Sequence, residues 1–126
     1  MKTTPSLWLN CPAMLVAFAR IANERTRQRE LFRMGKLSCS VASPVTDDNR
    51  KLRVVMEEVG EIAHEIDLLE MVTKGRTEST KAFTARYQAR RSELREEITQ
   101  AAAVLVAWLE SFEAKSTINS QPSTKS

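Results

Sequence analysis

Three glutamates repeat along one edge of an amphipathic pattern at residues 51–69. Glu58, Glu61 and Glu65 are spaced three and four residues apart, so an α-helix would place them on one side. No Lys or Arg lies among them, whereas a solvated helix face usually carries both signs of charge. A carboxylate beside an apolar face is costly to desolvate unless a cation pairs with it. The stripe indicates a metal-facing surface, although spacing alone favours a solvated helix edge.

A second amphipathic pattern, at residues 93–112, repeats this geometry. It carries Glu97 and Gln100 on the matching edge, and antiparallel packing of the two helices would bring both residues next to Glu58 and Glu61. Three carboxylates and one amide oxygen form an all-oxygen ligand set, which suits Mg²⁺, or Mn²⁺ as the alternative, better than zinc. We therefore predict a metal site made by these four residues.

Three sequence blocks occur in a characteristic order along the chain. They are ERTRQ at 24–28 with LFRMGK at 31–36, EEVGE at 57–61, and LREEITQAAAV at 94–104 followed by AWLE at 107–110. Together, over residues 21–110, they resemble the MazG family, and in particular its small members common in phages and prophages. That family comprises all-α nucleoside triphosphate pyrophosphohydrolases with an ExxE motif on one helix and an ExxD motif on another.

The resemblance implies a metal-dependent enzyme that converts a nucleoside triphosphate into the monophosphate and pyrophosphate, with Glu58 and Glu61 as catalytic residues. It also implies a bundle of about four helices, completed by assembly into a homodimer or homotetramer. One position departs from the family pattern: Gln100 stands where ExxD has its last acid. An amide offers an oxygen but no charge, so we expect weaker divalent binding. The alternative is a catalytically weak or inactive module that binds a nucleotide or a protein partner.

Basic and aromatic residues outside the acidic motifs are candidates for nucleotide binding. A triphosphate beside an acidic site needs compensating cations. The candidates are Lys36, Arg86 and Arg90, with Arg91, for the phosphates, and Arg27, Gln28 and Phe32 for a base pocket. Phe32 would stack on the base. The competing interpretation places Phe32 in the core and Arg27 on the surface, and spacing does not choose between the two.

The elements that must position these residues are all helical. The chain has 126 residues, of which 42% are hydrophobic and 28% charged, as in one globular domain with a modest core. Only three Gly and four Pro, with little period-two alternation, favour an all-α fold. We expect a first helix from near Pro12 to before Gly35, the two acidic helices, and a weaker helix around 82–87. Thr46 or Asp47 is the expected N-cap of the central helix.

We expect an N-terminal segment at 1–12, a MazG-like domain at 13–113 and a disordered tail at 114–126, because the tail lacks apolar periodicity. No run of about 18 apolar residues predicts a membrane span. Asn10 and Pro12 interrupt the apolar N-terminal run, which disfavours a signal peptide and favours a cytoplasmic protein. The net charge of +3, with only Phe83 and Tyr87 interleaved in the basic segment at 74–92, makes nucleic acid an unlikely partner.

Overall fold

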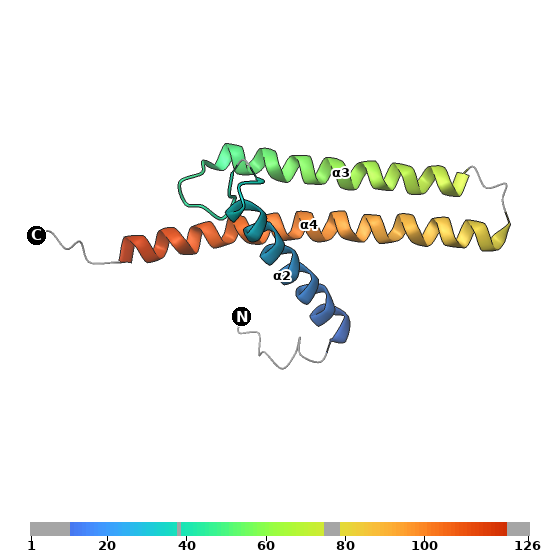
Figure 1. The fold of residues 1–126 in the computed structure, drawn as a ribbon, viewed down its shortest axis with the longest axis horizontal. Helices are drawn as coiled ribbons and strands as arrows, with labels where there is room; N and C mark the ends of the chain where they lie inside the picture. The colour runs from blue at the N-terminus through green and yellow to red at the C-terminus, as the bar shows by residue number, and fades with distance from the viewer. Residues whose placement is uncertain (1–10, 38, 75–78, 121–126) are drawn as a thin grey trace, which may run out of the picture.

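The computed structural model describes residues 11–37, 39–74 and 79–120, with side chains as far as residue 114. These ranges contain three helices, α2 (Pro12–Arg33), α3 (Asp48–Lys74) and α4 (Thr80–Ser120), and no strand. Figure 1 shows α3 and α4 side by side as a long antiparallel hairpin, while α2 packs obliquely on α4. The predicted all-α class is confirmed.

The limits of α2 follow from its end residues. Pro12 lies in the first turn, where the missing N–H costs nothing, and Cys11 before it is extended. At the other end Gly35 has a φ of 74°, a left-handed conformation that favours glycine. The Gly35 N–H donates to the Phe32 carbonyl and the Lys36 N–H to that of Leu31, which together form a Schellman cap. The predicted start and end of this helix are confirmed.

Asp47 is the N-cap of the central helix. The sequence predicted either Thr46 or Asp47 at this position, and the structure selects Asp47. Its carboxylate accepts a hydrogen bond from the Arg50 backbone N–H at 2.9 Å, and its carbonyl accepts one from the Lys51 N–H at 3.2 Å. The helix α3 extends beyond the predicted 51–69 at both ends and finishes at Lys74. The expected turn at Lys74 and Gly75 falls mostly outside the described residues.

The last helix is longer than expected. We predicted a weak helix around 82–87 and a separate one at 93–112, but α4 is continuous over 41 residues. The reason is that the interval from Thr80 to Ser120 contains neither Gly nor Pro, so nothing interrupts the helical backbone. The described chain accordingly has three helices, not four. Helix α4 also continues past Glu113, where we expected a disordered tail, and residues 121–126 lie outside the described part.

A small core holds these elements together. Val104 and Ala107 of α4 are buried against Val41 of the loop between α2 and α3. The partly buried side chains around them are Ala42, Val54, Val55 and Trp108. Many large apolar side chains remain exposed on all three helices. This exposed area agrees with the expected oligomer, which stays a prediction. No helix in the described ranges combines the length and the apolarity that crossing a bilayer requires.

Candidate metal and nucleotide site

The structure brings three of the four predicted metal ligands together. Glu58 and Glu61 lie on one side of α3, and Glu97 faces them from α4 because the two helices run antiparallel. One carboxylate oxygen from each residue lies within 4.8 Å of the others. Two oxygens that each lie about 2.0–2.6 Å from a shared cation are at most about 5 Å apart. The spacing of the three carboxylates therefore suits a single divalent ion.

The surroundings of this cluster raise the pKa of two of its carboxyl groups, Glu97 and Glu58. Burial, a hydrogen bond with Glu61 and the neighbouring negative charges together raise the pKa of Glu97 to about 7. Burial also raises the pKa of Glu58, together with repulsion from Glu61 and from Glu24 of α2. Without a cation, the cluster therefore favours holding a proton.

Two buried oxygen atoms indicate whether the cluster could bind a metal ion. Oε2 of Glu58 and Oε2 of Glu97 are both buried, and neither has a hydrogen-bond partner among the described residues. A buried polar atom without a partner is uncommon in folded proteins and calls for a bound ion or water. Carboxylate oxygens are the ligands that Mg²⁺ and Mn²⁺ prefer. The residues present therefore fit a hard divalent cation.

The fourth predicted ligand, Gln100, lies one turn beyond Glu97 on α4. It lines the same groove as Glu58, and its backbone carbonyl accepts a long hydrogen bond, 3.5 Å, from the Gln28 side-chain amide. Its side chain is half-buried. Coordination by the Gln100 amide oxygen stays a prediction, whereas its place beside the cluster is shown.

A groove of about 370 Å³ opens beside the carboxylates, between the second half of α2, the loop after it, and the α3–α4 pair. The three residues expected to form a base pocket, Arg27, Gln28 and Phe32, all line it, as does Glu58. Phe32 is 45% exposed, so the interpretation that placed it in the core is wrong. The same interpretation placed Arg27 on the surface, and the Arg27 side chain is indeed exposed. Val54 and Val104 are among the apolar residues in the walls. The groove offers both an aromatic face and polar groups to a ligand.

Glu24 is a member of this site that the sequence reasoning missed. Its carboxylate is buried, and it accepts hydrogen bonds from Arg27 at 2.6 and 2.8 Å and from Gln28 at 3.4 Å. These bonds fix the two side chains in the wall of the groove and raise the pKa of Arg27. The spacing of three and four residues from Glu24 to its partners was the available signal, because such pairs are neighbours on a helix.

The ion pair between Arg25 and Glu110 was also unexpected. Nε of Arg25, a buried residue of α2, lies 2.5 Å from Oε2 of Glu110 on α4. Arg29 approaches the other oxygen of Glu110 at 3.4 Å. These contacts join α2 to α4 along the wall of the groove.

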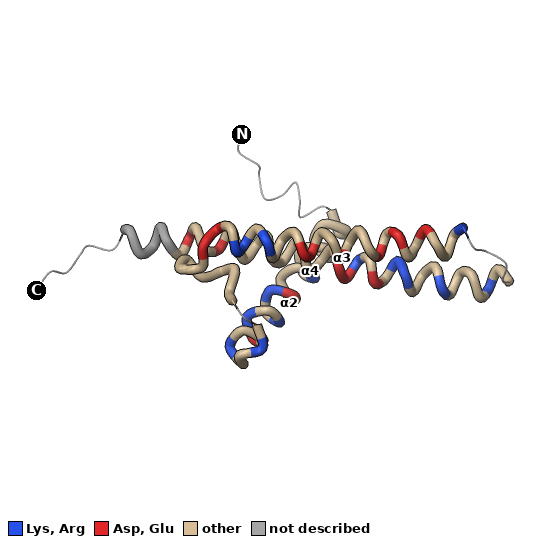
Figure 2. Tube along the Cα trace, turned by 90° about the horizontal axis from the view of Figure 1, so that it is seen from above, with Lys and Arg blue, Asp and Glu red and all other residues tan. Residues whose placement is uncertain are grey.

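The expected phosphate-binding residues are not gathered at the groove. Lys36, Arg86 and Arg90 are absent from its lining. Arg90 instead reaches from α4 to α3, where its Nη1 lies 3.4 Å from Oε2 of Glu65. Figure 2 shows the wider setting of this pair, with mainly acidic residues in the second half of α3 and mainly basic ones in the first half of α4. Arg90 therefore offsets the charge of Glu65 next to the cluster.

The chain matches no protein-family model, no curated protein and no solved structure. Its function is inferred from the side chains of this site.

Proposed function

We propose that the protein is a divalent-cation-dependent pyrophosphohydrolase that converts a nucleoside or deoxynucleoside triphosphate into the monophosphate and pyrophosphate. The observation that carries the proposal is the cluster of Glu58, Glu61 and Glu97, with two buried oxygens that lack partners, at the edge of a groove. The MazG-like order of sequence blocks supports the same conclusion, since Glu58 and Glu61 belong to the EEVGE block and Glu97 to the block at 94–104.

The three carboxylates share the cation in this proposal, and Glu61 has a further part. Glu58 and Glu97, both partly buried, would hold the cation together with Glu61, and the amide oxygen of Gln100 would complete the set. A divalent cation bound there supplies Lewis-acid stabilisation of the charge on the phosphate oxygens. Glu61 is exposed and can accept the proton of the attacking water. The water oxygen bonds to the α-phosphorus, the bond from that phosphorus to the bridging oxygen breaks, and pyrophosphate leaves.

The groove would hold the nucleoside. Its volume of about 370 Å³ falls within the range of about 300–1,000 Å³ usual for small-molecule sites. Phe32 presents an exposed ring on which a base can stack, and Gln28 and Arg27 supply hydrogen-bonding groups beside it. Glu24 orients both polar side chains, so the wall is organised before a ligand binds.

A second candidate function is a binding module without hydrolytic activity. Two observations favour it. Gln100 supplies no charge where the family has an acid, and the arginines at the groove already pair with carboxylates of the chain, Arg27 with Glu24 and Arg25 with Glu110. A nucleotide or a peptide could then occupy the groove without turnover.

The deciding experiment measures pyrophosphate release from canonical and modified nucleoside triphosphates, with Mg²⁺, with Mn²⁺ and with chelator. Glu58→Ala and Glu61→Ala are compared with Asp67→Ala, an exposed acid on the same helix. The hydrolase proposal expects metal-dependent release that falls by about 10²-fold or more in both cluster variants and persists in the control. Release from no nucleotide, with all variants folded and the nucleotides still binding, would establish the binding module instead.

A further inference from the structure

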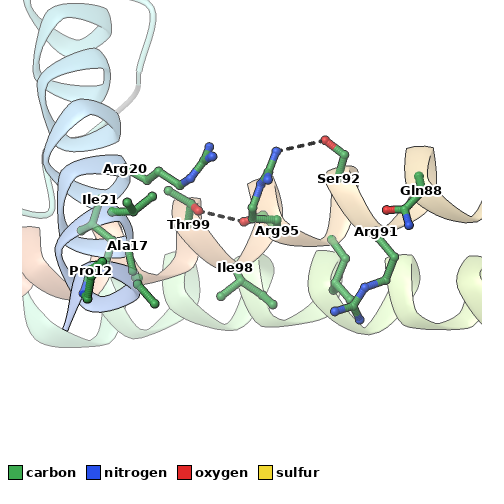
Figure 3. Close-up of a pocket in the computed structure, with 14 residues that line it drawn as sticks. Pro12, Ala17, Arg20, Ile21, Gln88, Arg91, Ser92, Arg95, Ile98 and Thr99 are labelled. Carbon is green, nitrogen blue, oxygen red and sulfur yellow. Dashed lines mark hydrogen bonds between the residues drawn. The ribbon is translucent and has the colours of Figure 1, made fainter.

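A second groove, of about 780 Å³, lies between the first half of α2 and the first half of α4. Figure 3 shows its residues: Arg20 and Arg95 point to one side, and Arg91 points to the other. Between them the surface is mostly apolar, formed by Val16, Ala17, Ile21, Leu94, Ile98 and Ala102. The groove shares no lining residue with the nucleotide groove, so the proposed reaction does not account for it.

This apolar surface is open rather than filled. Val16 is 54% exposed and Ile98 is 50% exposed, although each comes from a helix that packs against the other. Exposed apolar surface edged by polar groups is a candidate for covering by another segment or molecule. The three arginines at its edge make no ion pair with any carboxylate in the part of the chain that the structure describes.

The chain itself supplies an occupant next to this groove. Residues 1–10 directly precede Cys11 and contain three consecutive large apolar residues, Leu7, Trp8 and Leu9. The groove lining begins with Pro12 and Ala13, the first residues of α2. The apolar triplet is therefore tethered at one end of the groove by only a few residues.

The tether is long enough to reach along the groove. A backbone spans about 3.3–3.6 Å per residue, so Leu7 can extend to about 18 Å from Pro12. Along α2, Ile21 lies about 14 Å from Pro12, at a rise of about 1.5 Å per residue. The whole apolar floor contributed by α2 is thus within reach.

We propose that Leu7, Trp8 and Leu9 bind in the groove between α2 and α4 and cover its apolar floor. A short tether gives an effective concentration on the order of millimolar, so a contact whose dissociation constant lies well below that value is largely formed. Trp8 supplies the largest apolar area, and its indole N–H can donate to the Ser92 hydroxyl or the Gln88 amide oxygen at the rim. The rim arginines keep their charged ends in water while their stems border the apolar floor.

The two tryptophans of the chain, Trp8 and Trp108, make a direct test possible. In the full chain carrying Trp108→Phe, Trp8 is the single emitter. The proposal expects its emission to be blue-shifted, and its quenching by acrylamide to be several-fold slower, relative to a free peptide of residues 1–10. Adding Ile98→Asp should return both values to those of the peptide. Leu105→Asp is the matched control, because Leu105 is 48% exposed on the same helix and outside the groove.

Three results would overturn the proposal: peptide-like emission in the parent chain, equal effects of Ile98→Asp and Leu105→Asp, or protection that disappears on dilution. The last result would mean that the segment binds to a second copy of the chain. If Trp108→Phe does not fold, by circular dichroism, the parent chain labelled with 5-fluorotryptophan replaces it. Fluorine NMR then gives separate signals for Trp8 and Trp108, and only the Trp8 signal should shift with Ile98→Asp.

Discussion

Glu58 of α3 and Glu97 of α4 face each other across the helix pair, with carboxylate oxygens within 4.8 Å. Each also has a buried oxygen, Oε2, that has no hydrogen-bond partner among the described residues. Like charges at this distance in a partly desolvated site favour either a shared proton or a bound cation. The choice between proton and cation determines the behaviour of the protein in the first two predictions.

Divalent cations should stabilise the fold through this cluster. At pH 8, Mg²⁺ or Mn²⁺ at 100 times its dissociation constant should raise the free energy of unfolding by about 2.7 kcal/mol, measured by thermal and urea melts. Glu97→Gln removes one charged ligand and should weaken binding at least about tenfold in calorimetric titration. Glu93→Gln, an exposed acid on the same helix, should change neither value. Equal losses in the two variants would mean that the ion binds only to the general negative surface.

Without metal, the cluster should make stability fall as pH rises. The pKa of Glu97 is about 7 in the folded protein, against 4.5 as its ordinary value. The folded state binds the proton more tightly, so this stabilisation is complete below pH 4.5, declines between pH 4.5 and 7, and is lost above pH 7. Glu97→Gln should therefore match the parent near pH 4.5 and be the more stable protein at pH 8. Urea melts in chelator measure the difference, and parallel curves for the two proteins would contradict the assignment.

Restoring the family's acid should strengthen the metal site. Gln100→Asp adds a charge beside Glu58 and Glu97, so we expect about tenfold tighter Mg²⁺ binding, since ligand charge tunes divalent affinity. The same change should destabilise the metal-free protein, because it adds repulsion to a cluster that already disfavours ionisation. Calorimetric titration and urea melts test both effects. Gln88→Asp, at an exposed position on the same helix and outside the cluster, is the control for metal affinity. Unchanged affinity in Gln100→Asp would place residue 100 outside the ligand set.

Phe32 should contribute to nucleotide affinity. Stacking of a base on an aromatic ring is worth about 1–3 kcal/mol by alanine substitution, so Phe32→Ala should weaken nucleotide binding by about 5- to 150-fold. Phe112→Ala is a matched control, since Phe112 has similar exposure, 54%, and lies outside the groove. Titration with a non-hydrolysable triphosphate analogue measures the nucleotide affinity of both variants. If the Phe32 variant binds like the control, the base lies elsewhere.

The ion pair of Arg25 should stabilise the fold much more than that of Arg29, although both reach Glu110. The side chain of Arg25 is 11% exposed and lies 2.5 Å from its partner oxygen, whereas that of Arg29 is 67% exposed and lies at 3.4 Å. Arg25→Ala should lower the free energy of unfolding by about 1–3 kcal/mol. Arg29→Ala should cost about 0.5 kcal/mol or less. Urea melts of the two variants measure these losses in the free energy of unfolding. Equal losses would show that the burial of Arg25 does not make its ion pair the more stabilising one.

The parts that the sequence predicted are those governed by local rules. The spacing of Glu58 and Glu61 placed them on one helix edge, and the matching pattern around Glu97 placed it opposite. Pro12, Gly35 and Asp47 marked helix ends because each has a specific backbone role. These features need only a few neighbouring residues to determine them.

The parts that the sequence did not predict depend on contacts between distant segments. The bond from Arg25 to Glu110 spans 85 positions, and only the crossing of α2 over α4 brings the two together. Arg90 was expected at the phosphates because of its charge, but it pairs with Glu65 across the hairpin. The continuity of α4 was missed because weak apolar periodicity near 82–87 suggested a separate element, whereas the absence of Gly and Pro decided it.

Helix α2 borders both grooves, so the two grooves share one wall. Its first half, with Val16 and Ile21, borders one groove, and its second half, with Phe32, borders the other. In the second half, Arg25 pairs with Glu110 of α4 in the wall of the nucleotide groove. Gln28 and Arg29 add further contacts from this half of the helix to α4. A ligand that displaced α2 in one groove would therefore reshape the other, and any resulting coupling free energy would be the same in both directions.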